Sequence, residues 1–294
     1  MIMDGYFKCL ITLCMLSVVH MHCSENSPPN TKQPLSLAQS ISVGGLAGAA
    51  EVTFPGQILT YAMAQKIREK PFILSHSYRG FQANALGDMS ITAAQKVIYT
   101  GGVQWGQKLK GAKLSEWENT GISFAAGVGG AVMDTPSNAV QLYLQDEKHA
   151  GKSTIQACKE LGRKSFRGFT ANAFLKEGPF AVAWLMLAQK GELVAQEYVG
   201  KNLGATILGG LPVGIVTAVA TQPGAVIRNK MQNDSSKITY KTTLQTAVKI
   251  CKDEGSKALF KGLPERGVRV GIAVPLLAIY ANLLEKYICK ETTA

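Results

Sequence analysis

Long apolar stretches alternate with short polar segments along the chain after residue 36. Each stretch is long enough to cross a membrane core as a helix, which takes about 20 residues. Glycines and polar residues recur within them, as expected for helices that line a wet interior and are apolar only outside. The predicted membrane helices are Leu37–Gln65, Ala83–Gln107, Gly121–Gln145, Ala171–Val199, Leu203–Met231 and Val268–Ile288. The alternative, a soluble protein with long core helices, is disfavoured because internal glycine and proline cost a soluble helix about 1 and 3 kcal/mol each.

The pattern recurs three times, at a spacing of about 90 residues that exceeds the period of solenoid units. Each copy has a run of small apolar residues that ends in a proline, and later an aromatic-basic-glycine element. The prolines are Pro55, Pro136 and Pro223, and the glycines of the later elements are Gly80, Gly168 and Gly262. Between the long helices of the last two copies lie amphipathic stretches, typical of helices at a membrane surface. These are Lys152–Arg163 and Leu244–Glu254, whereas Lys70–Ser77 in the first copy shows no such pattern.

The repeats predict an all-α membrane protein, in which six transmembrane helices form three pseudo-threefold repeats, each with a short amphipathic surface helix. We expect a leader or disordered N-terminus at 1–36 and repeats at 37–120, 121–202 and 203–294. The apolar run Tyr6–His22 has three interpretations: a signal, an extra helix, or a misassigned start with translation beginning at Met21.

Two features of the odd-numbered helices predict their packing. Small residues one turn apart let membrane helices approach closely, and the proline downstream is expected to kink each helix. The small-residue pairs are Gly44 with Gly48, Ala125 with Gly129, and Gly210 with Gly214.

The formal net charge of +11 calls for an acidic partner or surroundings. Lysine and arginine gather beside the membrane segments, and the chain has no recognisable DNA- or RNA-binding module. We therefore expect a lipid surface or an anionic solute as partner, and no nucleic acid. The sequence has no nucleophile-elbow, phosphate-loop or zinc-protease motif, so it predicts neither an enzyme nor a cofactor. The six cysteines form no CxxC pair and are expected to be free thiols, and no metal site is predicted.

The prolines and the YRG, FRG and FKG elements resemble those of the mitochondrial carrier family, over roughly Leu37 to Lys286. The segment EGSKALFKG, at Glu254–Gly262, keeps the family's second element in full. The resemblance implies a monomeric solute carrier that works by alternating access in the mitochondrial inner membrane, with lipid such as cardiolipin at its surface helices. A carrier delivered to host mitochondria by an intracellular organism is an alternative to a fast-evolving eukaryotic carrier.

The charged gate of that family is incomplete in this chain. Where the family has acids after the prolines, the chain has Gln57, Asn138 and Ala225, and where it has bases, Thr60, Gln141 and Arg228. We expect Arg228 to face Asn138, with at most a hydrogen bond of about 1 kcal/mol replacing an ion pair. Gln145 and Gln232 occupy the family's glutamine-brace positions, and Ala64 does not. At the other end, Tyr99, Leu187 and Tyr280 are not followed by the family's acids.

The family's contact positions, counted from the repeat glycines, point to the residues that would bind the solute. They are Gly87 and Asp88, Leu175 and Lys176, and Arg269. Arginine suits forked contacts with phosphate or carboxylate, and charges inside a membrane are costly unless they bind something. The alternative for Arg269 is an ion pair with Glu265 or Glu177.

These residues predict a carrier of an anionic metabolite. A nucleotide such as ATP or ADP is slightly favoured as the solute over a di- or tricarboxylate. ArgAsnLysMetGln at 228–232 resembles a stretch of the ADP/ATP carriers, whereas the small-residue run before Pro55 resembles the tricarboxylate carriers. A membrane scaffold that does not transport is the remaining alternative.

Overall fold

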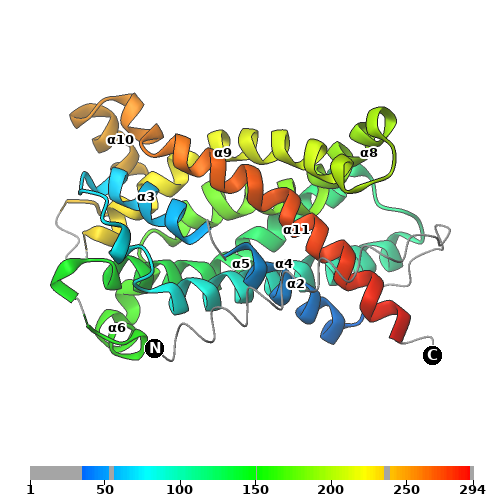
Figure 1. The fold of residues 1–294 in the computed structure, drawn as a ribbon, viewed down its shortest axis with the longest axis horizontal. Helices are drawn as coiled ribbons and strands as arrows, with labels where there is room; N and C mark the ends of the chain where they lie inside the picture. Colours follow the sequence, from blue (N-terminus) through cyan, green and yellow to red (C-terminus); the bar gives the residue numbers. More distant parts are fainter. Residues whose placement is uncertain (1–34, 53–55, 150, 235–238, 292–294) are drawn as a thin grey trace.

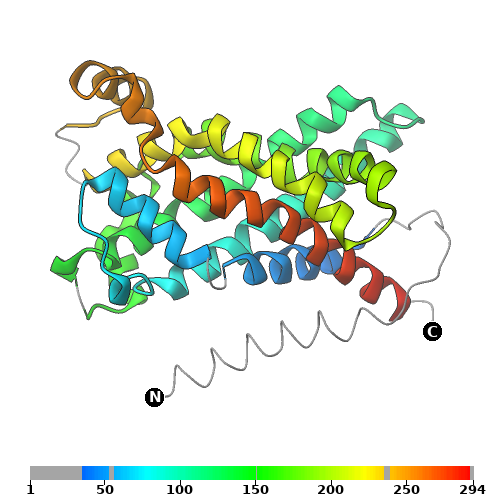
Figure 2. The same ribbon diagram turned by 45° about the horizontal axis from the view of Figure 1, so that its top comes forward.

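The computed structural model describes residues 35–52, 56–149, 151–234 and 239–291. These residues form helices and no strands, which confirms the predicted all-α fold. Figures 1 and 2 show the long helices side by side, following the longest axis of the molecule. The short helices α6 (Thr154–Leu161) and α10 (Thr243–Asp253) lie at one end, which we call the surface-helix end.

Each predicted membrane block contains a helical rod. The rods are, in chain order, α2 (Leu37–Glu51) with α3 (Gly56–Arg68); α4 (Phe81–Lys110); α5 (Glu116–Leu144); η4 (Ala171–Glu177), α7 (Gly178–Val182), η5 (Ala183–Leu187) and α8 (Ala188–Val199); α9 (Leu203–Asn233); and α11 (Leu263–Glu291). The fourth rod is composite, because η4 and η5 are π-helical turns. Short 3₁₀ turns complete the connections: η1 (Leu74–His76), η2 (Glu147–His149), η3 (Gly162–Phe166) and η6 (Ser256–Phe260).

The surface helices begin at capping residues. Ser153 caps α6 with a full capping box, and the side chain of Thr242 accepts a hydrogen bond from the backbone of Gln245 at the start of α10. In the first copy only η1 stands in their place, in line with the lack of an amphipathic pattern there.

Within the described residues, two helical segments meet the length and composition that a membrane-crossing helix needs. They are Leu203–Asn233 and Ser256–Tyr287. The other long rods carry more polar residues, many of which face the interior.

Prolines lie inside two of the odd-numbered rods. Pro136 lies within α5 and Pro223 within α9, whereas Pro55 falls outside the described residues. Next to Pro136, the hydroxyl of Thr135 donates to Ala131 O (2.7 Å) and that of Ser137 to Met133 O (2.9 Å). Both are bonds from a side chain to the carbonyl one turn earlier, a kind of bond that often bends a helix.

The helices approach closely at glycines. A Cβ atom on Gly48 of α2 would lie 2.3 Å from Asp88 O of α4, and one on Gly214 of α9 would lie 2.4 Å from Val270 O of α11. The first and third predicted small-residue pairs therefore lie at backbone contacts. In α5 the close approach occurs at Gly127 instead, where a Cβ would lie 2.1 Å from Glu177 O. The predicted Gly129 meets only the side chain of Ile98.

The glycines of the aromatic-basic-glycine elements make one contact that recurs in cyclic order. All three have positive φ angles, which glycine adopts without strain. A Cβ on Gly80 would meet Gln141 of α5, one on Gly168 would meet Arg228 of α9, and one on Gly262 would meet Met63 of α3. Each linker thus packs against the odd-numbered helix of the next predicted repeat, and the third packs against that of the first.

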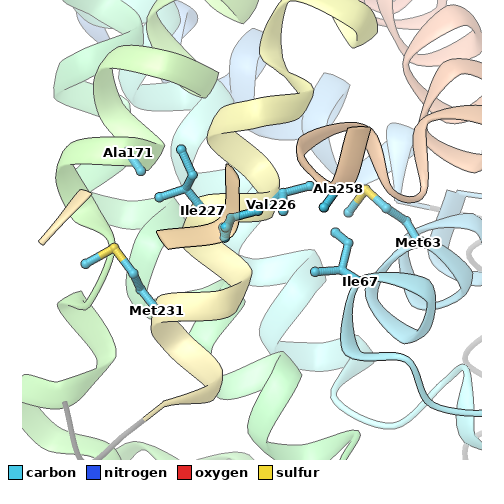
Figure 3. Close-up of a cluster of buried hydrophobic side chains, with 8 residues drawn as sticks. Met63, Ile67, Ala171, Val226, Ile227, Met231 and Ala258 are labelled. Carbon is cyan, nitrogen blue, oxygen red and sulfur yellow. The ribbon is translucent and has the colours of Figure 1, made fainter. Parts of the chain in front are cut away.

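Apolar clusters lie on both sides of the polar interior. Near the surface-helix end, Met63 and Ile67 of α3 pack with Val226 and Ile227 of α9 and with Ala258 of η6 (Figure 3). Toward the other end, a second cluster joins side chains of several rods. Its members are Ala47, Ala126, Ala181, Trp184, Leu185 and Leu277, with Tyr99, Phe180 and Tyr280 against them.

Candidate functional site

A polar cavity lies between these clusters, lined by residues of all six rods. Its volume is about 40 Å³, measured as the space open to the centres of water molecules. That is room for a few waters. A larger solute therefore needs the helices to separate. The charged residues that line the cavity are Glu51, Asp88, Asp134, Lys176, Glu177, Arg228, Arg266 and Arg269.

Arg269 of α11 lies between two carboxylates. Its Nη2 is 2.8 Å from Glu51 Oε1 of α2 and 3.3 Å from Asp88 Oδ2 of α4. The expected alternative partners of Arg269 are wrong, because Glu265 pairs with Lys66 instead and Glu177 with Lys176. Of the predicted contact residues, the cavity thus brings Asp88 and Arg269 together.

Asp134 of α5 is the centre of a second group. Its Oδ2 is 3.0 Å from Lys176 Nζ and 3.3 Å from Arg228 Nη1. Asn172 Nδ2 donates to the same oxygen at 2.8 Å, and Asn138 donates to Oδ1. Arg228 therefore has a carboxylate partner. The expectation that Arg228 would have only a hydrogen bond to Asn138 is wrong, because the acid lies one turn earlier on α5.

Arg266 of α11 differs from the other cavity cations. Its Nη2 donates to Thr221 Oγ1 at 2.6 Å and its Nη1 to Thr221 O at 3.4 Å. The residue is 3% exposed. Among the described residues it has no carboxylate within ion-pair distance, whereas Lys176, Arg228 and Arg269 each have at least one. Its partners are neutral, so the charge itself is available to a ligand.

Two predicted contact residues do not line the cavity. Gly87 faces α5, where a Cβ would lie 2.5 Å from Ser137 Cβ, and Leu175 is 41% exposed beside Gly224 of α9. Leu175 lies in the π-helical turn η4, which rotates side chains away from the register of an α-helix.

The neutral residues at the gate positions form a hydrogen-bonded set. Gln57 Nε2 donates to Ser77 O at 2.8 Å, while Gln57 Oε1 accepts from Asn84 at 2.8 Å and from Gln141 at 3.4 Å. The contact between Gln57 and Gln141 joins the first and second predicted repeats without an ion pair.

The glutamines at the brace positions behave differently from each other. Gln232 Nε2 donates to Thr135 O at 3.0 Å and so links α9 to α5. Gln145 is buried, and neither polar atom of its side chain has a partner among the described residues.

Charged contacts at the surface-helix end join the odd-numbered helices. Arg68 at the end of α3 donates to Asn233 Oδ1 of α9 (2.8 Å) and to Leu142 O of α5 (2.9 Å), and so bridges three rods. Lys70 pairs with Asp146 at 2.8 Å. These contacts lie further along the helices than the family's charged gate, which explains why the gate positions did not reveal them.

A second charged network at the same end joins the third predicted repeat to the first. Lys261 pairs with Glu69 and, at 3.0 Å, with Glu254, which also pairs with Lys230 at 2.8 Å. Burial raises the pKa of Glu254, but hydrogen bonds from Lys230 and Lys261 outweigh it and hold that pKa below its ordinary value.

At the opposite end, Lys96 of α4 pairs with Glu285 of α11 at 2.6 Å. Both side chains are at most 15% exposed. This pair lies near Tyr99 and Tyr280, where the family's acids are missing, and joins two even-numbered rods.

The sequence contained a signal for the cavity acids that counting from the glycines missed. Glu51 and Asp134 are acidic residues within small apolar runs just before the first two prolines. A charge inside a membrane segment suggests a functional site by itself. Arg266 could have been found as the second arginine one turn before Arg269.

No group of residues that could hold a metal ion occurs within the described part of the chain. Cys158 and Cys251 are free and exposed, as expected for thiols on the surface helices.

Comparisons with known proteins agree with the fold. The family model described as mitochondrial carrier protein matches residues 200–290. The chain is 25% identical to the tricarboxylate transport protein of Saccharomyces cerevisiae, over 86% of this chain and 97% of the yeast protein. It is 30% identical to the mitochondrial glycine transporter of Xenopus tropicalis, over 53% of this chain and 54% of that protein. It is 25% identical to mitochondrial magnesium exporter 1 of Drosophila melanogaster, over 63% of this chain and 66% of that protein.

The yeast relative aligns over nearly its whole length, and the frog relative over about half of its own. These proteins are named as transporters of chemically different solutes, so their names do not agree on one solute. The chain is therefore similar to mitochondrial carrier proteins: residues 200–290 match the family model, and most of the chain aligns with the yeast transport protein.

Proposed function

We propose that this carrier transports a small carboxylate-bearing metabolite and that Arg266 binds the carboxylate. The observation that carries the proposal is the bonding of Arg266, which is buried in the cavity and whose side chain has Thr221 as its one hydrogen-bond partner among the described residues. A guanidinium offers a fork of donors that matches a carboxylate. A solute that reaches Arg266 supplies the negative charge that this residue lacks among its described neighbours.

The other cavity cations support this assignment. Arg269 lies one turn after Arg266 on α11, and its Nε is buried without a partner among the described residues. An anion between the two arginines gains contacts with both. Lys176 faces the same cavity from η4.

A carboxylate fits this site better than a nucleotide. Four carboxylates line the cavity, at Glu51, Asp88, Asp134 and Glu177. They already pair with Lys176, Arg228 and Arg269, so Arg266 is the one described lining cation without a carboxylate partner. A single free guanidinium matches one carboxylate better than a chain of phosphates. The full-length similarity to a tricarboxylate transport protein favours the same class.

An amino acid is the second candidate. Glu51 and Asp88 share Arg269, so an ammonium group could take part of their charge while its carboxylate binds Arg266. The similarity to a glycine transporter over about half of that protein supports this alternative.

Uptake of labelled citrate and glycine into proteoliposomes tests the proposal. Arg266→Ala should abolish saturable uptake, and Arg266→Lys should restore little because the fork of donors is lost. Arg163→Ala, an arginine exposed on η3, is the matched control and should leave uptake unchanged. Unchanged uptake in a folded Arg266→Ala variant would remove Arg266 from the site. The absence of any saturable uptake by the wild type would favour a non-transporting scaffold.

A further inference from the structure

The charged side chains that line the cavity balance one another. The basic residues are Lys176, Arg228, Arg266 and Arg269, and the acidic residues are Glu51, Asp88, Asp134 and Glu177. When all of them are ionised, the described lining has no net charge. A cavity built only to attract an anion would instead carry an excess of basic residues.

The balance comes from contacts between different rods. Arg269 of α11 meets Glu51 of α2 at 2.8 Å and Asp88 of α4 at 3.3 Å. On the other side, Asp134 of α5 joins Lys176 of η4 and Arg228 of α9. These side chains are mostly buried, so water screens their charges poorly.

Alternating access makes this balance important. To return without a solute, the carrier must pass through a state in which its empty cavity is closed to both sides. An uncompensated charge makes that state costly, because the charge has left water without gaining a counterion. Such a carrier returns only with an anion bound and therefore exchanges solutes. In this cavity the acidic and basic side chains are equal in number, and every described cation except Arg266 has a carboxylate partner, so the lining as a whole meets less of this obstacle.

We infer that this carrier reorients while empty and so performs net transport, without requiring a counter-solute. Glu51 is the built-in counterion that permits the return step, because it holds Arg269 when no solute is bound. The inference rests on the proposed function only in that a carboxylate solute reports the transport. It concerns the mode of transport and holds for a carboxylic acid or an amino acid.

The test compares uptake into proteoliposomes that contain no internal solute with uptake into vesicles loaded with the same unlabelled solute. Labelled citrate and glycine are the probes. The wild type should take up a probe into empty vesicles at a rate within a few-fold of the exchange rate. Glu51→Gln leaves Arg269 with Asp88 and gives the cavity one excess positive charge. This variant should lose about tenfold or more of its uptake into empty vesicles while retaining exchange, because the bound carboxylate replaces the missing charge.

Glu116→Gln is the matched control. Glu116 lies at the exposed start of α5, outside the cavity, where it pairs with Lys190. Its replacement should leave both transport modes unchanged. Wild-type uptake that requires internal solute would overturn the inference and leave the proposed function intact. An equal loss of both modes in Glu51→Gln would also overturn it, because Glu51 would then serve solute binding or folding.

A measurement without solute covers the case in which neither probe is transported. Thr60 lines the cavity, and Thr60→Cys can be made in a variant whose six native cysteines are replaced by serine. A membrane-impermeant thiol reagent should label it from either face, in washed mitoplasts and in inside-out inner-membrane vesicles. In the Glu51→Gln background, labelling should persist from one face only. Labelling of the otherwise unchanged carrier from a single face would contradict empty reorientation.

Discussion

Asp134 accepts hydrogen bonds from two cations and two amides inside the cavity. Its contacts are Lys176, Arg228, Asn172 and Asn138. The residue is 2% exposed, so removal of its charge leaves the buried Arg228 and the partly buried Lys176 with less compensation.

Asp134→Asn is predicted to lower the free energy of unfolding by about 3 to 5 kcal/mol, the usual cost of breaking a buried ion pair from one side. Thermal or denaturant unfolding of the purified carrier in detergent measures this loss. Asp253→Asn is the matched control, because Asp253 forms an exposed pair with Lys249 within α10. Loss of this exposed pair should lower the free energy of unfolding by about 0.3 to 0.5 kcal/mol. Equal stability of the two variants would show that the Asp134 group does not hold the rods together.

At the scale of helices, the structure depends on backbone contacts that only glycine permits. On α5, Gly127 faces the backbone of η4, whereas Gly121 has open space where a Cβ would lie. The same substitution, glycine to alanine, is therefore expected to affect stability differently at these two positions of one helix.

Gly127→Ala is predicted to destabilise the carrier, because its methyl group would overlap Glu177 O and force α5 and the fourth rod apart. Gly121→Ala should be neutral or stabilising by up to about 1 kcal/mol, from helix propensity alone. Melting temperatures of the two purified variants measure the difference. A Gly127→Ala variant as stable as Gly121→Ala would mean that α5 and the fourth rod do not pack this closely.

The sequence predicted the rods well because apolar runs, prolines and linker glycines are local signals. The fourth rod shows the limit of counting along a helix. In its π-helical segment η4, the side chain of Leu175 is partly exposed, whereas that of Lys176 still lines the cavity. The replacement contacts of the gate could not be predicted either. Arg68 reaches Asn233 and Leu142 across large sequence separations, and no pattern within one repeat specifies that meeting.

At the scale of the whole molecule, the surface helices α6 and α10 lie at the same end (Figure 1). Cys158 on α6 and Cys251 on α10 are both free and exposed. A membrane-impermeant thiol reagent is therefore predicted to label both from the same side of the inner membrane. Labelling can be measured in single-cysteine variants with mitoplasts and with inside-out vesicles. Labelling of the two cysteines from opposite sides would contradict the arrangement of six membrane helices.

Across the whole molecule, the charged groups of the cavity pair mainly with one another, and Arg266 has no carboxylate partner among the described residues. We propose that small carboxylates use this cavity. The most direct test is saturable uptake of labelled citrate by the wild-type carrier in proteoliposomes, with unlabelled citrate, glycine and ATP as competitors. We expect saturable uptake that citrate suppresses fully and ATP suppresses less at equal concentration. Saturable uptake of labelled ATP, with no uptake of citrate or glycine, would contradict it.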